Sequence, residues 1–331
     1  MRDRQSWLAA RKHGLGGSDI AAICGLSKWR GPLEVYADKR GLVEDSPTTE
    51  IMEWGNRLEA VVAEKYAESL PKECKLITAE EYGFSDTGLH THPDHEWMHG
   101  TPDRIVMAWD DFEPWGLEIK TTHSSRGGEW GEQGTDQIPS YYRCQVAWYQ
   151  AIFDLDRWDV AVLIGGQQYR TYTVKRDMAL ETRLIEIGRR FWTEHVLAGV
   201  PPEPTATSNE TMQALFPHNE GTTATATAEV DAVGCELGRL RAQEAQIAED
   251  RAALENRIKA AIGENDGVGG RGWRATWKAP KPSTKTDWEG VARNIAQSMG
   301  DEGVALFDRI RTAHTTQAQG SRRFLFKTEE E

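Results

Sequence analysis

The residues best suited to chemistry lie in one stretch, TPDRIVMAWDDFEPWGLEIKTT, which holds two well-placed carboxylates and a lysine. Asp103 follows a proline, and Glu118 and Lys120 come fifteen residues later with a single residue between them. Side chains alternate between the faces of a β-strand, so Glu118 and Lys120 would share one face while Ile119 points into a core. Carboxylates can hold a divalent cation, and a lysine beside them can orient an attacking water or lower its pKa. The stretch therefore predicts a metal-dependent site that cleaves phosphodiester bonds.

An E-x-K pair also occurs on solvated strand faces, where it forms an ordinary ion pair without a catalytic role. Neighbouring features favour catalysis here: the Pro102-Asp103 pair, Gly116 at the start of the second strand, and a glutamine motif further along the chain. The catalytic interpretation rests on this set of features and not on E-x-K alone.

The glutamine motif is Q-V-A-W-Y, in which Gln145 and Tyr149 are four residues apart on a predicted helix and share one face. A glutamine amide can hold a water or a phosphate oxygen, and a tyrosine can bond to or stack on a nucleic-acid backbone. Taken alone, Tyr149 is an ordinary core residue and Gln145 an ordinary surface residue. Their position after P-D and E-x-K favours the site interpretation.

Glu59, in the predicted helix W-G-N-R-L-E-A, is a candidate third carboxylate. Such a residue could complete a second metal site, in which two ions clamp the attacking and leaving oxygens. The alternative is an ordinary exposed helical glutamate, and Glu64 and Glu68 compete for the role on the same helix.

Arg11 and Ser18 flank the glycines of R-K-H-G-L-G-G-S. Backbone N–H groups at a helix start, with an arginine and a hydroxyl nearby, suit a phosphate. An N-cap serine beside a solvated arginine is the alternative, and this segment alone favours it.

The composition limits the function classes. The net charge of −13 over 331 residues gives no global field for DNA or membranes, although a nuclease needs only a local basic path. The four cysteines form no C-x-x-C pair, which argues against zinc or iron–sulfur ligation and fits a reducing cytoplasm. No signal peptide is recognisable and no apolar run reaches transmembrane length, so we expect a cytoplasmic protein without membrane partners.

Hydrophobic periodicity and turn residues predict an alternation of helices and strands over the first 200 residues. Ser18 is expected to cap the second helix. Helices are expected at about residues 2–11, 18–24, 32–40, 50–68, 139–153 and 177–197, and strands at about 76–77, 89–92, 100–107, 115–122, 158–164 and 168–174.

Residues 219–228 are low in complexity and are predicted to link residues 1–218 to an extension, 229–331. The extension should begin with a long helix to Ile262 whose broadly heptad apolar stripe suits a coiled-coil arm or helical hairpin. A Gly-rich loop, a strand W-R-A-T-W-K, a helix from Asp287 and a terminal strand R-R-F-L-F-K are expected to follow. A basic run interleaved with tryptophans fits either nucleic acid or a protein-binding module; it comprises Arg271, Trp273, Arg274, Trp277, Lys278, Lys281 and Lys285.

Five motifs in a fixed order resemble the YqaJ-like viral recombinase family, a relative of the bacteriophage lambda exonuclease within the PD-(D/E)xK nuclease superfamily. The resemblance covers roughly residues 5–200. The motifs are W-L-A-A-R-K-H-G-L-G-G-S-D-I-A-A-I-C-G-L-S, W-G-N-R-L-E, T-P-D-R, L-E-I-K and Y-Y-R-C-Q-V-A-W-Y.

The resemblance implies an α/β fold, namely a restriction-endonuclease-like core with a mixed central sheet flanked by helices, followed here by a helical extension with a small α+β tail. It implies that residues 1–218 are a nuclease domain. The implied roles are metal binding by Asp103, Glu118, the Ile119 carbonyl and Glu59, catalysis by Lys120 and Gln145, and contact with DNA or its 5′-terminal phosphate by Arg11, Ser18 and Tyr149. Asp94 could match a further family acid, and the gap between Asp103 and Glu118 is long for the family.

The implied activity is Mg²⁺-dependent 5′→3′ degradation of one strand of linear duplex DNA, with Mn²⁺ as an alternative metal. The implied partners are DNA ends, a single-strand annealing protein and further copies of the chain in a ring of three or four. A phage or prophage gene expressed in bacterial cytoplasm is the implied setting. Two alternatives stay open: a structure-specific endonuclease on the same core, and a non-catalytic protein that recruits recombination partners through residues 229–331.

Overall fold

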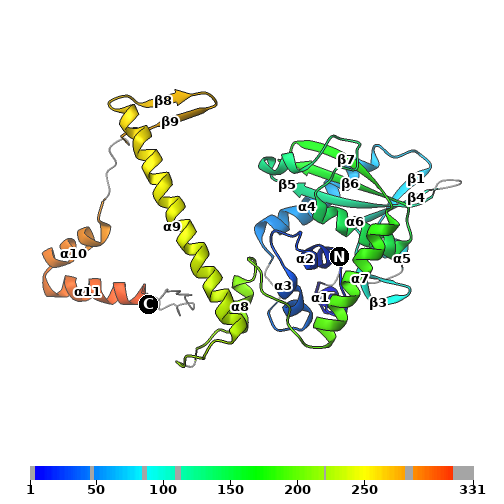
Figure 1. Cartoon of the computed structure of the whole chain (residues 1–331), viewed down its shortest axis with the longest axis horizontal. Helices are drawn as coiled ribbons and strands as arrows, with labels where there is room; N and C mark the ends of the chain where they lie inside the picture. The colour runs from blue at the N-terminus through cyan, green and yellow to red at the C-terminus, as the bar shows by residue number, and fades with distance from the viewer. Residues whose placement is uncertain are drawn as a thin grey trace. The chain divides into compact units, whose positions relative to one another are not determined.

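The computed structural model of the protein describes residues 4–44, 48–83, 88–108, 113–219, 221–279 and 286–315. The chain forms two compact units, Met1–Pro217 and His218–Glu331 (Figure 1). Among the described residues no helix combines the length and the apolar character that are needed to cross a bilayer.

A five-stranded mixed sheet is the centre of the first unit (Figure 1). Strand β5 runs parallel to β6, and the other neighbouring pairs are antiparallel. The parallel pair is joined through helix α6 (Ser140–Phe153), because parallel strands need a crossover connection. The strands, in spatial order, are β1 (Cys74–Ile77), β4 (Arg104–Ala108), β5 (Trp115–Thr122), β6 (Arg157–Ile164) and β7 (Gln168–Lys175).

Helices cover both faces of this sheet. Helix α4 (Glu50–Ala67) packs on one face, where Leu117 and Ile119 of β5 join its buried residues in one core cluster. On the other face α6 lies against β6 and is itself covered by α2 (Gly17–Ile23) and α7 (Met178–Phe191). The predicted α/β fold, with a mixed central sheet flanked by helices, is confirmed.

The alternation of side chains along β5 makes the two faces chemically different. Leu117 and Ile119 are buried under α4, whereas Glu118 and Lys120 point to the α6 face, where Glu118 bonds to a side chain of α6. A close approach of β5 to β6 requires Gly116, since a Cβ at this position would meet the Trp158 ring at 2.3 Å. The strand therefore presents its polar pair to one side only, as its period-2 pattern predicts.

Further elements surround the sheet, and they correct the expected boundaries. The strand expected at 100–107 is divided into β3 (His95–Gly100), which pairs with β2 (His90–His92), and β4, which joins the main sheet. The break contains Pro102, which has no N–H to donate to a ladder. The helix expected to end at 197 finishes as a π-helical turn, η2 (Trp192–Leu197). The remaining elements are α1 (Arg4–Arg11), α3 (Pro32–Lys39), α5 (Ala79–Gly83), the 3₁₀ helix η1 (Ser124–Glu129) and α8 (Asn209–Leu215).

The second unit begins with the long helix α9 (Ala228–Ile262), followed by a hairpin of β8 (Gly267–Gly270) and β9 (Trp273–Thr276). Strand β8 lies in the segment expected to be a Gly-rich loop, because its backbone pairs with the predicted strand W-R-A-T. The apolar residues of α9 that recur every seven positions, Val233, Leu240, Ile247 and Leu254, are exposed. The coiled-coil arm stays a prediction. The expected terminal strand at 322–327, Lys281 and Lys285 lie outside the described residues.

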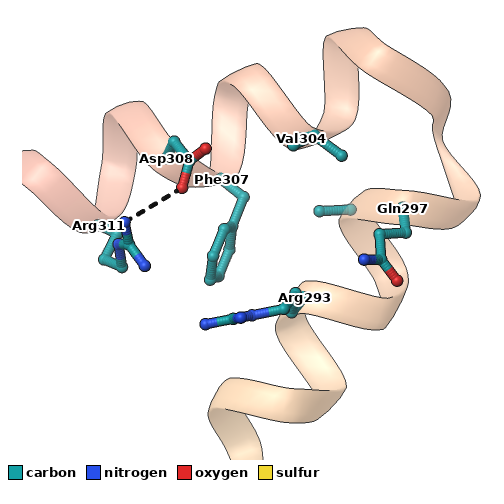
Figure 2. Close-up of a pocket in the computed structure, with 7 residues that line it drawn as sticks. Arg293, Gln297, Val304, Phe307, Asp308 and Arg311 are labelled. Atoms are coloured by element: carbon teal, nitrogen blue, oxygen red, sulfur yellow. Dashed lines mark ion pairs between the residues drawn. The ribbon is translucent and has the colours of Figure 1, made fainter.

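Two helices, α10 (Trp288–Ser298) and α11 (Gly300–Ala313), form a hairpin with a cavity of about 220 Å³ between them (Figure 2). Arg293 and Arg311 approach the Phe307 ring to 6.0 and 5.9 Å. Arg311 pairs with Asp308 at 3.4 Å and Arg293 with Glu289 at 2.9 Å, so both guanidinium groups already have acidic partners on their own helices.

Candidate active site

Asp103 and Glu118 lie side by side on neighbouring strands. The pairing of Arg104 with Leu117 places Asp103 next to Glu118 across the β4–β5 ladder. The Asp103 Oδ2 atom accepts the backbone N–H of Ile119 at 2.7 Å, which fixes the carboxylate against the strand. A hairpin therefore spans the long sequence gap between the two acids.

Glu118 is the centre of the polar cluster and is 2% exposed. Its Oε1 atom accepts from the Lys120 ammonium and, at 2.7 Å, from the Gln145 side-chain amide. The same amide donates to the Tyr149 hydroxyl at 3.1 Å, and that hydroxyl donates to the Thr101 carbonyl at 3.3 Å. The structure thus brings the E-x-K pair and both residues of the glutamine motif into one hydrogen-bonded group.

Glu59 reaches the edge of this cluster from α4. Its Oε1 atom accepts from Arg104 at 2.7 Å, and its charge contributes to a raised pKa of Glu118. The two competing acids on α4 are exposed, and Glu68 pairs with Lys65 at 2.6 Å. Of the three candidate acids, Glu59 is therefore the one near Glu118, although its carboxylate is paired with Arg104.

Burial and like charge act on the two central acids. Burial, followed by the charge of Glu118, raises the pKa of Asp103 to about 7, against the opposing effect of Lys120. Burial also raises the pKa of Glu118. For Lys120 burial would lower the pKa, but the charges of Glu118 and Asp103 outweigh it and raise the pKa. The Lys120 ammonium thus offsets the charge of two crowded carboxylates, and Arg104 adds a smaller positive contribution at Asp103.

A divalent cation fits this donor set. The Glu118 Oε2 atom is buried and has no hydrogen-bond partner among the residues that the structure describes, which is rare for a buried carboxylate oxygen. Hard cations take oxygen ligands, and Asp103, Glu118 and the Ile119 carbonyl would supply them. Within the described ranges no three His, Cys, Asp or Glu side chains form a ready metal-holding group. The expected gathering of three acids is therefore incomplete, because Glu59 is paired with Arg104.

Arg11 and Ser18 lie on two consecutive helices. Arg11 ends α1 and stacks over the Trp7 ring at 4.7 Å. Ser18 is exposed in the first turn of α2, whose N-cap is Gly16, so the expectation that Ser18 caps this helix is wrong. Asp19 replaces it in that function, because its Oδ2 atom accepts the Gly16 N–H at 2.9 Å.

Asp19 was missed by sequence reasoning, since nothing distinguishes it from an ordinary helix-start acid. It is fully buried, and its carboxylate lies 2.7 Å from Lys39, 3.3 Å from Arg30 and 3.6 Å from Arg11. Its three cationic partners come from α1, the loop before α3 and α3. These elements are separate in the chain, so only the fold brings the three cations to Asp19. Asp19 is a shared counter-ion that ties Arg11 to these elements.

A glycine joins this segment to the polar cluster. A Cβ on Gly17 would meet Gln145 Cγ at 2.8 Å and Tyr149 Cε1 at 3.0 Å. Residue 17 therefore packs directly on the glutamine motif, and Ser18 follows it in the chain. This contact explains the glycine at position 17 and brings the start of α2 to the glutamine motif.

The substitution Gly17→Ala is expected to lower DNA cleavage about tenfold, because the added methyl group must displace Gln145 from Glu118. Gly128→Ala is the matched control, since a Cβ there meets nothing within 4 Å. Initial rates on linear duplex DNA measure the effect. Equal rates for the two variants would show that the Gln145 position does not limit activity.

Asp19→Asn is expected to lower the free energy of unfolding by about 3–5 kcal/mol at pH 7, because it leaves the buried Lys39 ammonium without its carboxylate partner. Burial would raise the pKa of Asp19, but Lys39, Arg11 and Arg30 outweigh it and hold the pKa far below the usual 3.8. The stabilisation is therefore complete above the unfolded-state pKa and is lost as pH falls toward the folded-state pKa. Urea unfolding at pH 7 and at pH 3 measures it. Exposed Asp177→Asn is the control, since asparagine also caps a helix.

The histidines and Asp94 of the β2–β3 hairpin make their contacts within the hairpin. His92 stacks on His95 at 4.7 Å, and His99 is buried with Nε2 3.0 Å from the Glu96 carbonyl. Asp94 lies in the turn, where its N–H donates to His92 at 3.1 Å. The histidine contacts are those of structural residues, whereas the match of Asp94 to a family acid stays a prediction.

Comparison with known proteins gives a family model and several similar proteins. Residues 6–156 match the model of the YqaJ-like viral recombinase domain. The chain is 27% identical over 295 residues to an uncharacterized protein YqaJ of Bacillus subtilis (strain 168), and the match covers 86% of each protein. This match therefore continues beyond Met1–Pro217 into the second unit.

Solved structures were also compared. An alkaline exonuclease of Laribacter hongkongensis, LHK-Exo, matches with a TM-score of 0.45 and 18% identity over 59% of this chain and 94% of that one. Its complex with dAMP matches with the same score and identity, over 63% of this chain and 96% of that one.

Proposed function

We propose that the chain is a metal-dependent exonuclease of the YqaJ-like viral recombinase family, whose domain model residues 6–156 match. The proposed reaction removes nucleotides from the 5′ ends of linear double-stranded DNA and leaves 3′ overhangs for recombination. One observation carries the proposal: Asp103, Glu118, Lys120 and Gln145, from three elements, form one buried polar cluster with an unpartnered carboxylate oxygen.

Asp103, Glu118 and the Ile119 carbonyl would hold a Mg²⁺ ion, with Mn²⁺ as an alternative. Glu59 could assist a second ion on release from Arg104. A bound ion of this kind supplies charge stabilisation at the phosphate and lowers the pKa of a water. In this proposal the Lys120 ammonium, which bonds to Glu118, would orient the attacking water. The Gln145 side-chain amide, which bonds to Glu118 and Tyr149, would hold that water or a phosphate oxygen.

End recognition is assigned in this proposal to Arg11 and Ser18, with Tyr149 near the DNA backbone. Two observations support it. Gly17, the neighbour of Ser18 in the chain, packs against Gln145, and the Arg11 guanidinium shares Asp19 with Arg30 and Lys39. A terminal phosphate held there would set the 5′→3′ direction.

The wider setting of the proposal comprises other molecules. The expected partners are DNA ends, a single-strand annealing protein, and two or three further copies of the chain in a ring around the DNA. The expected location is the cytoplasm of a bacterial host carrying a phage or prophage. The extension after residue 228 has exposed tryptophans, Trp273 and Trp277, which suit DNA or a protein partner.

Product analysis on end-labelled linear DNA tests the activity, the polarity and the mode together. We expect mononucleotides from 5′ ends, dependence on Mg²⁺ that EDTA abolishes, and no cleavage of covalently closed circles. Cleavage of circles would replace the proposal with an endonuclease, and no cleavage of any DNA would leave a binding protein. A preference for 5′-phosphoryl over 5′-hydroxyl ends that is lost in Arg11→Ala would support the end-recognition site; an equal preference in both proteins would exclude it.

A further inference from the structure

A tryptophan stands open to solvent close to the candidate active site. Trp29 lies in the loop between α2 and α3 and is 56% exposed. The loop is held in place, because the Ser27 hydroxyl accepts from the backbone N–H groups of Trp29 and Arg30, both at 3.3 Å. Large exposed aromatic rings on fixed backbones are typical of contact residues.

Two tyrosine rings connect Trp29 to the catalytic lysine. The Lys120 ammonium lies 4.9 Å from the Tyr142 ring, and the Tyr142 and Tyr141 ring centroids are 4.3 Å apart. Tyr141 in turn meets Trp29 edge-on, with centroids 5.6 Å apart and an interplanar angle of 90°. DNA whose scissile phosphate is at Lys120 would therefore pass within a few nucleotides of the indole.

A cation covers part of the indole and is itself fixed. The Arg126 guanidinium lies over the Trp29 ring, 4.8 Å from its centroid. It donates to both Glu129 carboxylate oxygens, at 3.3 and 3.2 Å, and to the Tyr141 hydroxyl at 3.1 Å. Lys28 donates to the same Glu129 at 2.7 Å. The two cations share one carboxylate, so the surroundings of the ring keep an excess positive charge.

The charges around Trp29 favour a contact with nucleic acid over a contact with another protein. The core of a protein–protein interface is depleted in charged residues. Sites for single-stranded nucleic acid instead combine an aromatic ring for base stacking with nearby positive charge for the backbone. Trp29 has the second environment, because Arg126 lies over its ring and Lys28 bonds to the same Glu129 as Arg126.

We propose that Trp29, held by Arg126 and Tyr141, is a stacking platform for an unpaired nucleobase of the DNA strand at the active site. The inference rests on the proposed function and adds a base-binding site to it. The ligand class is any nucleobase, because stacking on an indole is tolerant of sequence. The platform would hold a base that has been separated from its complement while its neighbour is positioned for cleavage.

The test places 2-aminopurine, a base whose fluorescence falls on stacking, at single positions near the end of a linear duplex. Binding is followed with EDTA present so that no cleavage occurs. We expect a fluorescence change confined to one or two positions with wild type, and no such change with Trp29→Ala. The affinity of Trp29→Ala for single-stranded DNA should fall about 5- to 150-fold. Trp29→Phe should keep much of both signals. Trp288→Ala, from a 74%-exposed tryptophan of the second unit, is the control and should match wild type.

The outcomes separate this inference from the proposed function. If wild type degrades linear DNA with Mg²⁺ while Trp29→Ala gives the wild-type fluorescence pattern and affinity, the platform is wrong and the exonuclease stands. A Trp29→Ala protein that changes oligomeric mass but not base fluorescence would make Trp29 a contact between protein chains. Wild type that stacks the base but digests no DNA would keep the platform and remove the exonuclease. Circular dichroism and thermal unfolding confirm that each variant is folded.

Discussion

Methionine in place of Lys120 is expected to lower the rate of DNA cleavage by about 10³-fold, within the range for loss of a group that manages a proton or water. The Lys120 ammonium bonds to Glu118 and is the cation closest to the two central carboxylates in their raised-pKa environment. Methionine keeps the length and apolar stem of lysine and removes only the charge and the donors. Single-turnover digestion of end-labelled linear duplex with saturating Mg²⁺ measures the step itself.

Lys65→Met is the matched control, because Lys65 is exposed on α4 and pairs with Glu68. It should cleave DNA at the wild-type rate. Binding of duplex ends by Lys120→Met should change far less than its rate, since the residue acts on the reacting water and not on the DNA backbone. Wild-type cleavage by Lys120→Met would remove the lysine from the mechanism and leave Glu118 with a purely structural ion pair.

The sequence alone predicts which side chains share a face of a strand or a helix, because that depends on a local pattern. The alternation in L-E-I-K separates Leu117 and Ile119 from Glu118 and Lys120, and β5 buries the first pair under α4. Spacing of four residues likewise puts Gln145 and Tyr149 on one face of α6, in mutual contact at 3.1 Å. Period-2 and helical patterns depend on the backbone alone, so they survive in the fold.

Two predicted boundaries were wrong although the sequence contains residues that mark the correct ones. Helix α5 lies between the strands expected at 76–77 and 89–92, where no helix was predicted. Thr78 and Glu81 nevertheless form a capping box: the Thr78 N–H donates to Glu81 at 2.8 Å, and the Glu81 N–H donates to Thr78 at 3.3 Å. The T-x-x-E spacing predicts a helix N-terminus of this kind. Pro102 similarly marks the break between β3 and β4.

Other features need the tertiary structure. The burial of Asp19 depends on Arg11, Arg30 and Lys39 arriving from separate elements, and no spacing encodes that. The pairing of Glu59 with Arg104 is of the same kind, since it joins α4 to β4. Strand β8 is glycine-rich, with weak intrinsic preference for a strand, and only its partner β9 makes it one. Long-range charge and pairing therefore decide what local patterns leave open.

The substitution Asp103→Asn is expected to abolish cleavage, with a loss of about 10³-fold or more, and to remove the effect of Mg²⁺ on stability. Asparagine can still accept the Ile119 N–H, so the local backbone contact is retained while a charged ligand is lost. In wild type, Mg²⁺ at 100 times its dissociation constant should stabilise the fold by about 2.7 kcal/mol. Thermal unfolding with increasing Mg²⁺ measures this without any DNA or turnover.

Asp177→Asn, at the exposed N-cap of α7, is the control and should respond to Mg²⁺ as wild type does. Without metal, Asp103→Asn should be at least as stable as wild type, because it removes the repulsion between two adjacent carboxylates. A carboxylate kept at a cost to stability is typical of a functional site. If Mg²⁺ stabilised Asp103→Asn and wild type equally, the cation would bind elsewhere, and the cluster of Asp103 and Glu118 would lose its assignment as the metal site.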